Sequence, residues 1–151
     1  TKQVLDIIAE GDIILAGGHL HASELLIVFD EAKRRGVKKM LVNHPTYIVG
    51  TTDQDIRDLV SLGAYMEHSM CMFIDGSAKC FDETDLAHLI EVAGVDNTIL
   101  SSDLGLRGSP RPIVGYRQIV AMLLDLEFSH ADIRKLISSN AAGLLNLEGR
   151  A

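Results

Sequence analysis

The stretch Met40-Leu41-Val42-Asn43-His44 is a short apolar run that ends in a side chain able to bind a metal ion or move a proton. The same arrangement occurs three more times, in Ile13-Ile14-Leu15-Ala16-Gly17-Gly18-His19, Ala64-Tyr65-Met66-Glu67-His68 and Thr98-Ile99-Leu100-Ser101-Ser102-Asp103. We interpret each run as a strand. Because the carboxyl ends of successive parallel strands meet on one face of a sheet or barrel, these end residues predict a common functional face.

The segments between these runs have the apolar spacing of amphipathic helices. The expected helices cover residues 2–10, 23–35, 52–62 and 82–93, and the expected strands start at about Asp12 and cover 39–43, 64–67 and 98–101. The expected N-caps are Ser23, Thr52 (in a capping box with Asp55) and Asp82, and the expected helix ends are Gly11, as a left-handed residue, Gly36, Gly63 and Gly94. This alternation predicts a single α/β domain over residues 1–151, with four parallel strands and right-handed crossovers.

The pattern changes after the fourth strand. A loop rich in Gly and Pro, residues 105–112, leads into an expected long helix over 113–126, and Ser129 with Asp132 starts another helix. The loop between Glu67 and Asp82 is also long. Long loops on the carboxyl side of strands and tight glycine turns on the other side are typical of a face that carries a site.

Composition indicates an ordinary soluble globular domain. Of the 151 residues 47% are hydrophobic and 23% are charged, and the formal net charge is −7. No apolar run approaches the roughly 20 residues needed to cross a bilayer, and the first residues lack a signal-peptide core, so we expect a cytoplasmic protein without a membrane partner. The negative charge also argues against a nucleic-acid partner. Cys71 and Cys80 are not expected to form a structural disulfide.

Histidine and carboxylate side chains are the usual ligands of divalent metals. His19, His44 and Asp103 each follow a different expected strand, so they are candidates to bind one ion, with zinc first and manganese or iron as alternatives. Glu67 is the candidate for a further ligand or a general base. His21 is a secondary candidate, since His19-Leu20-His21 alternates as in a strand. Any one of these residues alone is better explained by a local hydrogen bond. Four of them in register favour a shared pocket.

Three further residues are candidates for contact with a small-molecule substrate. Tyr47 follows His44 closely and is expected to close over a ligand, and Arg107 and Arg111 in the Gly/Pro loop are candidates to bind an anionic group. His68 is expected to point away from Glu67, because successive side chains of a strand face opposite sides, and is therefore assigned a structural role.

Several segments resemble the amidohydrolase superfamily of metal-dependent hydrolases. They are Ala16-Gly17-Gly18-His19, Val42-Asn43-His44-Pro45, Leu100-Ser101-Ser102-Asp103-Leu104-Gly105 and Ile137-Ser138-Ser139-Asn140-Ala141-Ala142-Gly143-Leu144-Leu145-Asn146-Leu147. In that family the closing helix typically contains Asn-Pro-Ala-Arg-Leu-Leu-Gly-Leu. Here Ala141 replaces the proline and Gly143 replaces the arginine.

The resemblance implies specific roles. His19 and His44 match the metal-binding histidines of the fifth and sixth strands of the family's barrel, and Asp103 matches the aspartate of the eighth strand, which binds metal and acts as acid and base. Glu67 falls on the seventh strand, and a residue at its position has no general role in the superfamily.

The chain also departs from that family, since a complete (β/α)8 barrel has eight strands and about 250 residues. The four expected strands resemble strands five to eight of a TIM barrel, followed by extra carboxyl-terminal helices. The His-x-His motif of the first strand and the ligand of the fourth are missing. Because a half barrel leaves open strand edges, we expect it to associate with the missing amino-terminal half or with a second copy of itself.

Three functions follow as hypotheses. The first is a metal-dependent hydrolase that directs an activated water at a C–N or C–O bond and is active only with the missing half. The second is a phosphoesterase of the histidine-rich barrel type, in which Arg107 or Arg111 binds phosphate. The third is a non-catalytic α/β domain used for binding or assembly.

Overall fold

A computed structural model describes residues 1–147 of the chain. Its helices are α1 (Lys2–Glu10), α2 (Ala22–Arg34), α3 (Asp53–Leu62), α4 (Glu83–Ala93), α5 (Pro112–Asp125), α6 (His130–Arg134) and α7 (Asn140–Leu144). Its strands are β1 (Leu15–Ala16), β2 (Met40–Asn43), β3 (Ala64–Ser69) and β4 (Thr98–Ser101). Three short segments, η1 (Met70–Met72), η2 (Val95–Asn97) and η3 (Lys135–Ser139), complete the order. No helix within these residues is long and apolar enough to span a membrane.

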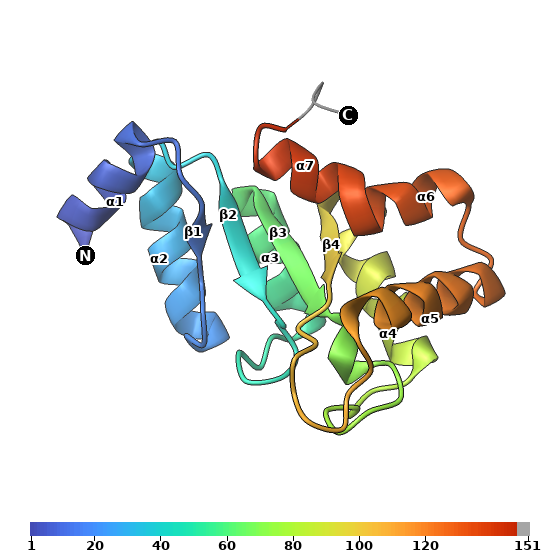
Figure 1. Cartoon of the computed structure of the whole chain (residues 1–151). Coiled ribbons are helices and arrows are strands. Elements are labelled where there is room, and N and C mark those ends of the chain that lie inside the picture. The colour runs from blue at the N-terminus through green and yellow to red at the C-terminus, as the bar shows by residue number, and fades with distance from the viewer. Residues whose placement is uncertain (148–151) are drawn as a thin grey trace. The chain divides into compact units, whose positions relative to one another are not determined.

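The strands form one parallel sheet in the order β1-β2-β3-β4, which confirms the predicted α/β class and the four-stranded parallel sheet. Figure 1 shows the arrows of β1, β2 and β3 side by side and pointing the same way. Leu15 is paired with Met40, and Asn43 is paired with Glu67. The polar residues that follow β1 and β2 therefore emerge at the same edge of the sheet.

The chain divides into two compact units. Among the described residues, the first contains 1–67 and 142–147, and the second contains 68–141. Fully buried side chains of the first unit include Leu25, Phe29, Val42, Ile56 and Leu59. Those of the second include Met70, Leu86, Leu100, Ile119 and Leu136. Each unit thus has an apolar core of its own.

Most of the predicted helix boundaries are confirmed. Thr52 and Asp55 form a reciprocal capping box at the start of α3, in which the Thr52 amide donates to the Asp55 carboxylate at 2.8 Å. Asp82 caps α4 in the same way. Gly63 ends α3 with φ of +99°, a left-handed conformation that glycine adopts without steric cost.

The start of α2 corrects the prediction, because His21 and not Ser23 is its N-cap. The His21 ring accepts the Ser23 amide, and the Glu24 carboxylate accepts the His21 amide at 3.2 Å. The N-cap therefore lies two residues earlier than expected. Residues 17–20 form a turn, so the predicted strand-like alternation of His19 and His21 is wrong.

The turn after α1 also differs from the prediction. Gly11 keeps a right-handed conformation (φ −78°), and the next residue, Asp12, takes φ of +47°. The Asp12 carboxylate accepts hydrogen bonds from Lys39 Nζ at 2.7 Å and from Asn146 Nδ2 at 3.0 Å. The Lys39 bond holds the pKa of Asp12 below its usual value. These bonds stabilise a turn that delays β1 to Leu15, beyond the expected start at Asp12.

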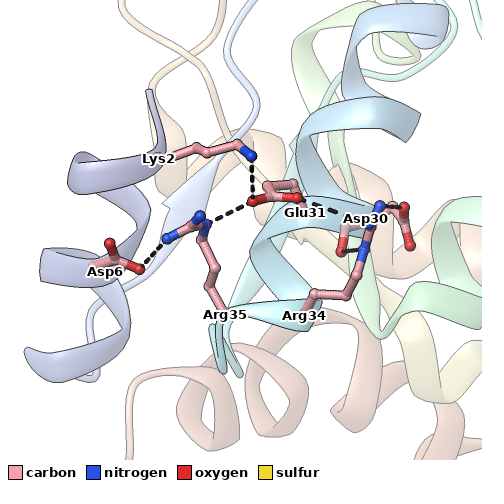
Figure 2. A network of polar contacts seen from close by, with 6 residues as sticks. All are labelled: Lys2, Asp6, Asp30, Glu31, Arg34 and Arg35. Atoms are coloured by element: carbon pink, nitrogen blue, oxygen red, sulfur yellow. Dashed lines mark hydrogen bonds and ion pairs between the residues drawn. The ribbon is translucent and has the colours of Figure 1, made fainter.

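A network of ion pairs joins α1 to α2 in the first unit (Figure 2). Its members are Lys2, Asp6, Asp30, Glu31, Arg34 and Arg35. Arg35 lies at its centre, with its guanidinium 2.6 Å from Asp6 Oδ1 and 2.7 Å from Glu31 Oε1. Because the network is partly exposed and screened by solvent, we expect it to orient α1 more than to stabilise the fold.

Strand β3 is longer than predicted, and the helix after Ser129 is less regular than predicted. β3 continues beyond the expected Glu67 to Ser69, and residues 66–69 are all buried. The expected long helix is α5. The helix that Ser129 caps does not continue regularly, because the π-helical segment η3 interrupts it after Arg134.

The interior of the second unit supports a packing prediction. A methyl group added at Gly115 of α5 would lie 2.2 Å from Leu104 Cδ1 and 3.1 Å from Ile74 Cδ1. We expect Gly115→Ala to lower the free energy of unfolding by about 1–3 kcal/mol through overpacking. At Gly105 nothing lies within 4 Å of such a methyl group, so Gly105→Ala is the control. Urea unfolding measures both, and equal stability of the two variants would contradict the packing of α5.

Candidate functional site

Two of the predicted metal ligands meet at the carboxyl ends of β1 and β2. His19 lies in the turn after β1, and His44 follows β2 directly. Their Nε2 atoms are 3.2 Å apart, and their ring centroids are separated by 4.9 Å at an interplanar angle of 48°. The structure therefore brings together two imidazoles that are 25 residues apart in the sequence.

The backbone places His44 in a restricted conformation. Its amide donates to the carbonyl of Glu67 at 2.7 Å, which continues the β2–β3 ladder by one residue beyond β2. Its φ is +29°, an unfavourable value for a residue with a side chain. Backbone strain of this kind is concentrated at functional sites, and here it aims the ring of His44 at His19.

The contact between the two rings has the geometry of two ligands of one ion. Two nitrogens bound to a tetrahedral zinc at 2.0–2.1 Å lie about 3.3 Å apart. The observed 3.2 Å between the Nε2 atoms fits this spacing, and it equally suits a hydrogen bond in which one ring donates to the other. His44 Nδ1 is buried and has no hydrogen-bond partner among the described residues.

Two histidines do not make a complete metal site. A catalytic zinc has three protein ligands and a structural zinc has four. Within residues 1–147 no group of three or more His, Cys, Asp or Glu side chains is arranged to hold a metal ion. The His19–His44 pair alone is therefore smaller than the ligand set of either kind of zinc site.

His21 is engaged in the cap of α2. Its Nδ1 accepts the Ser23 amide at 3.3 Å and lies 2.9 Å from Ser23 Oγ. A neutral imidazole that accepts at Nδ1 carries its proton on Nε2, and that nitrogen then has no lone pair for a metal. The cap thus opposes a role for His21 as a ligand.

Glu67 is buried in β3, with 6% of its surface exposed, and its Oε2 accepts a hydrogen bond from Asn43 Nδ2 at 3.1 Å. Because Asn43 and Glu67 are paired residues of adjacent strands, their side chains share one face of the sheet. Sequence reasoning singled out Glu67 but not Asn43. The signal was available, since Asn43 is the polar last residue of β2, next to His44.

Tyr47 lies next to the histidine pair. Its amide donates to the His44 carbonyl at 3.1 Å, and its ring stands edge-on to the His44 ring, with centroids 6.5 Å apart at 90°. More than half of the Tyr47 surface is exposed. The ring is therefore placed to contact a molecule bound beside the histidines.

The second unit carries the remaining predicted site residues. Asp103 follows β4, is exposed, and has φ of +42°. The buried thiol of Cys71 donates to its Oδ2 at 3.8 Å, a contact that sequence reasoning missed because the cysteines were considered only as a disulfide. Both Cys71 and Cys80 are free thiols. Arg107 and Arg111 are exposed in the loop before α5, where Ser77 Oγ donates to the Arg107 carbonyl at 3.0 Å.

Comparison with known proteins finds a family match for only part of the chain. Residues 1–67 match the model of a family of unknown function (DUF6282). The matched segment includes His19, His44 and Glu67 but not Asp103. No curated protein matches the chain.

His68 is fully buried and contacts Phe73 edge-on, with ring centroids 6.3 Å apart. Its Nε2 has no hydrogen-bond partner among the described residues, and burial lowers its pKa from 6.5 to about 4. The His68 ring is therefore neutral in the folded protein, whereas in the unfolded chain it is protonated more readily. Its contribution to stability is complete above pH 6.5 and is lost as the pH falls toward 4.

We therefore predict that between pH 7 and pH 5 the wild-type chain loses about 2 kcal/mol more unfolding free energy than His68→Leu. Urea unfolding at the two pH values measures this difference. The control is His88→Leu, which replaces an exposed histidine of α4 and should keep the wild-type pH dependence. Identical pH profiles for wild type and His68→Leu would contradict the burial of a neutral His68.

Proposed function

We propose that this chain contributes the carboxyl-terminal half of a metal-dependent hydrolase of the amidohydrolase type, with His19 and His44 as ligands of a divalent ion. The observation that carries the proposal is the 3.2 Å approach of the two Nε2 atoms at the carboxyl ends of adjacent parallel strands. Carboxyl ends of parallel strands are where α/β enzymes hold their catalytic groups. Zinc is the first candidate, since a pair of neutral imidazoles suits it; manganese or iron would bind similar ligands.

The chemistry proposed is hydrolysis. A divalent ion held by His19 and His44 would supply Lewis-acid chemistry, which lowers the pKa of water so that hydroxide is available near neutral pH to attack a C–N or C–O bond. Asp103 is the proposed ligand and acid/base group, a role taken from the resemblance and supported by its place after β4. Glu67 is the proposed general base, supported by the Asn43 amide that fixes one of its oxygens.

A partner belongs to the proposal, because His19, His44 and the proposed ligand Asp103 leave out the first-strand His-x-His motif and the fourth-strand ligand of the family that the chain resembles. The resemblance assigns the other ligands to the amino-terminal half of a barrel. A second copy of this chain is the other source. In either case the partner adds strands at the open edge of β1, which is paired only with β2 in the described sheet.

Zinc binding by the full chain tests the proposal. Equilibrium dialysis with Zn²⁺ should give one ion per site, and His19→Ala or His44→Ala should weaken binding at least about tenfold, or about 1.4 kcal/mol. His19 is exposed, so its replacement should leave stability almost unchanged. His88→Ala and His130→Ala remove exposed histidines of α4 and α6 and serve as matched controls.

A chain that binds no zinc, or one whose zinc affinity survives loss of both His19 and His44, would overturn the metal proposal. Asp103→Asn separates two versions of it. If Asp103 is a ligand, the substitution weakens zinc binding. If Asp103 acts only in proton transfer, zinc binding is retained.

A further inference from the structure

The two loops that carry the histidine pair form one connected surface. They are residues 17–21, between β1 and α2, and residues 44–52, between β2 and α3, and both follow the arrowheads of their strands (Figure 1). The amide of Ala22, the first residue of α2, donates to the carbonyl of Val49 at 3.0 Å. This bond joins the end of the first loop to the second, and the His19–His44 contact joins the loops again at 3.2 Å.

Apolar side chains are exposed on these loops. Leu20 is next to His19 and is 40% exposed, and Tyr47 and Ile48 follow His44 and are 55% and 49% exposed. Single exposed apolar residues are common on protein surfaces and need no explanation. Three of them on two loops that also hold a pair of metal-ligand side chains indicate a surface that binds an apolar group.

Charge is missing from the same surface. Neither loop contains a Lys, Arg, Asp or Glu: their sequences are Gly17-Gly18-His19-Leu20-His21 and His44-Pro45-Thr46-Tyr47-Ile48-Val49-Gly50-Thr51-Thr52. Recognition of a phosphate or carboxylate group normally uses Arg or Lys. The immediate surroundings of the histidine pair are therefore suited to an uncharged, apolar part of a ligand.

We propose that the substrate carries an aromatic or branched aliphatic group directly beside the bond that is cleaved, and that Leu20, Tyr47 and Ile48 receive this group. This inference rests on the proposed hydrolase function and names its substrate class as amides or esters of apolar acids. Tyr47 supplies the flat wall, because its ring stands perpendicular to that of His44 and is open to solvent. Leu20 and Ile48 supply the aliphatic border.

Two small hydroxamates test the inference without knowledge of the substrate. Acetohydroxamate and benzohydroxamate bind zinc through the same two oxygens and differ in whether a methyl group or a phenyl ring lies beside them. On the zinc-loaded full chain, benzohydroxamate should bind at least about tenfold more tightly, since the phenyl ring buries more apolar surface. Tyr47→Ala and Ile48→Ala should each reduce this preference.

Ile13→Ala is the matched control for Ile48→Ala. Ile13 is 53% exposed, similar to Ile48, but it precedes β1 and thus lies at the amino end of the strand. Its replacement should leave the preference for benzohydroxamate unchanged. A second readout uses the metal-free chain, in which benzamide should shift the side-chain NMR signals of Leu20, Tyr47 and Ile48 but not that of Ile13.

The outcomes separate the two proposals. If zinc and both hydroxamates bind but with equal affinity, or if the preference survives in Tyr47→Ala and Ile48→Ala, the apolar substrate class is wrong and the metal proposal stands. If zinc does not bind, the metal proposal fails, and the benzamide experiment then tests the apolar site by itself. NMR shifts confined to Leu20, Tyr47 and Ile48 support an apolar site. The absence of these shifts overturns it.

Discussion

Parallel pairing of β1, β2 and β3 is the constraint on which the rest of the structure depends. Its backbone hydrogen bonds include those from Leu15 to Lys39 at 2.8 Å, from Gly17 to Leu41 at 2.8 Å and from His44 to Glu67 at 2.7 Å. Parallel strands cannot be joined by a tight hairpin, so each connection contains a helix. The chain therefore leaves the sheet at the same edge after every strand. Two of the three bonds lie at this edge, where they hold the backbone from which His19 and His44 extend.

Left-handed backbone occurs at residues with side chains in two different settings. At Asp12 (φ +47°) the side chain offsets the local cost, because its carboxylate accepts bonds from Lys39 and Asn146. At His44 (φ +29°) and Asp103 (φ +42°) the side chains form no comparable set of bonds with the rest of residues 1–147. Each such residue costs roughly 1–2 kcal/mol relative to a right-handed conformation. The strain at His44 is maintained by the strand ladder rather than by the ring, which leaves the ring nitrogen free to face His19.

Local sequence signals predicted the parts of the fold that depend on a few neighbouring residues. The capping box at Thr52 and the N-cap Asp82 are such parts, because residues within three positions of the helix start decide them. His21 was missed because serine is the commoner cap; the carboxylate of Glu24, at the third helical position, makes His21 the better choice. The pairs Asn43–Glu67 and Cys71–Asp103 depend on the register between strands, which no single segment encodes. The alternation of strands and helices predicted that His19 and His44 emerge at the same end of the sheet. The 3.2 Å contact between their rings depends in addition on how the two loops are joined.

The π-helical segment η3 sets the rotation of Asn140, which follows it directly. A π-turn contains one residue more than an α-turn, so it turns the following side chains by about 100° relative to an uninterrupted helix. With that rotation, the Asn140 side-chain amide donates to two carbonyls, those of Val95 in η2 and of Thr98, the first residue of β4, both at 2.7 Å. Deletion of one residue from η3 would restore a regular helix yet turn Asn140 away from both carbonyls. The number of residues in η3 is therefore constrained, so we expect an insertion or deletion there to destabilise the fold more than a substitution.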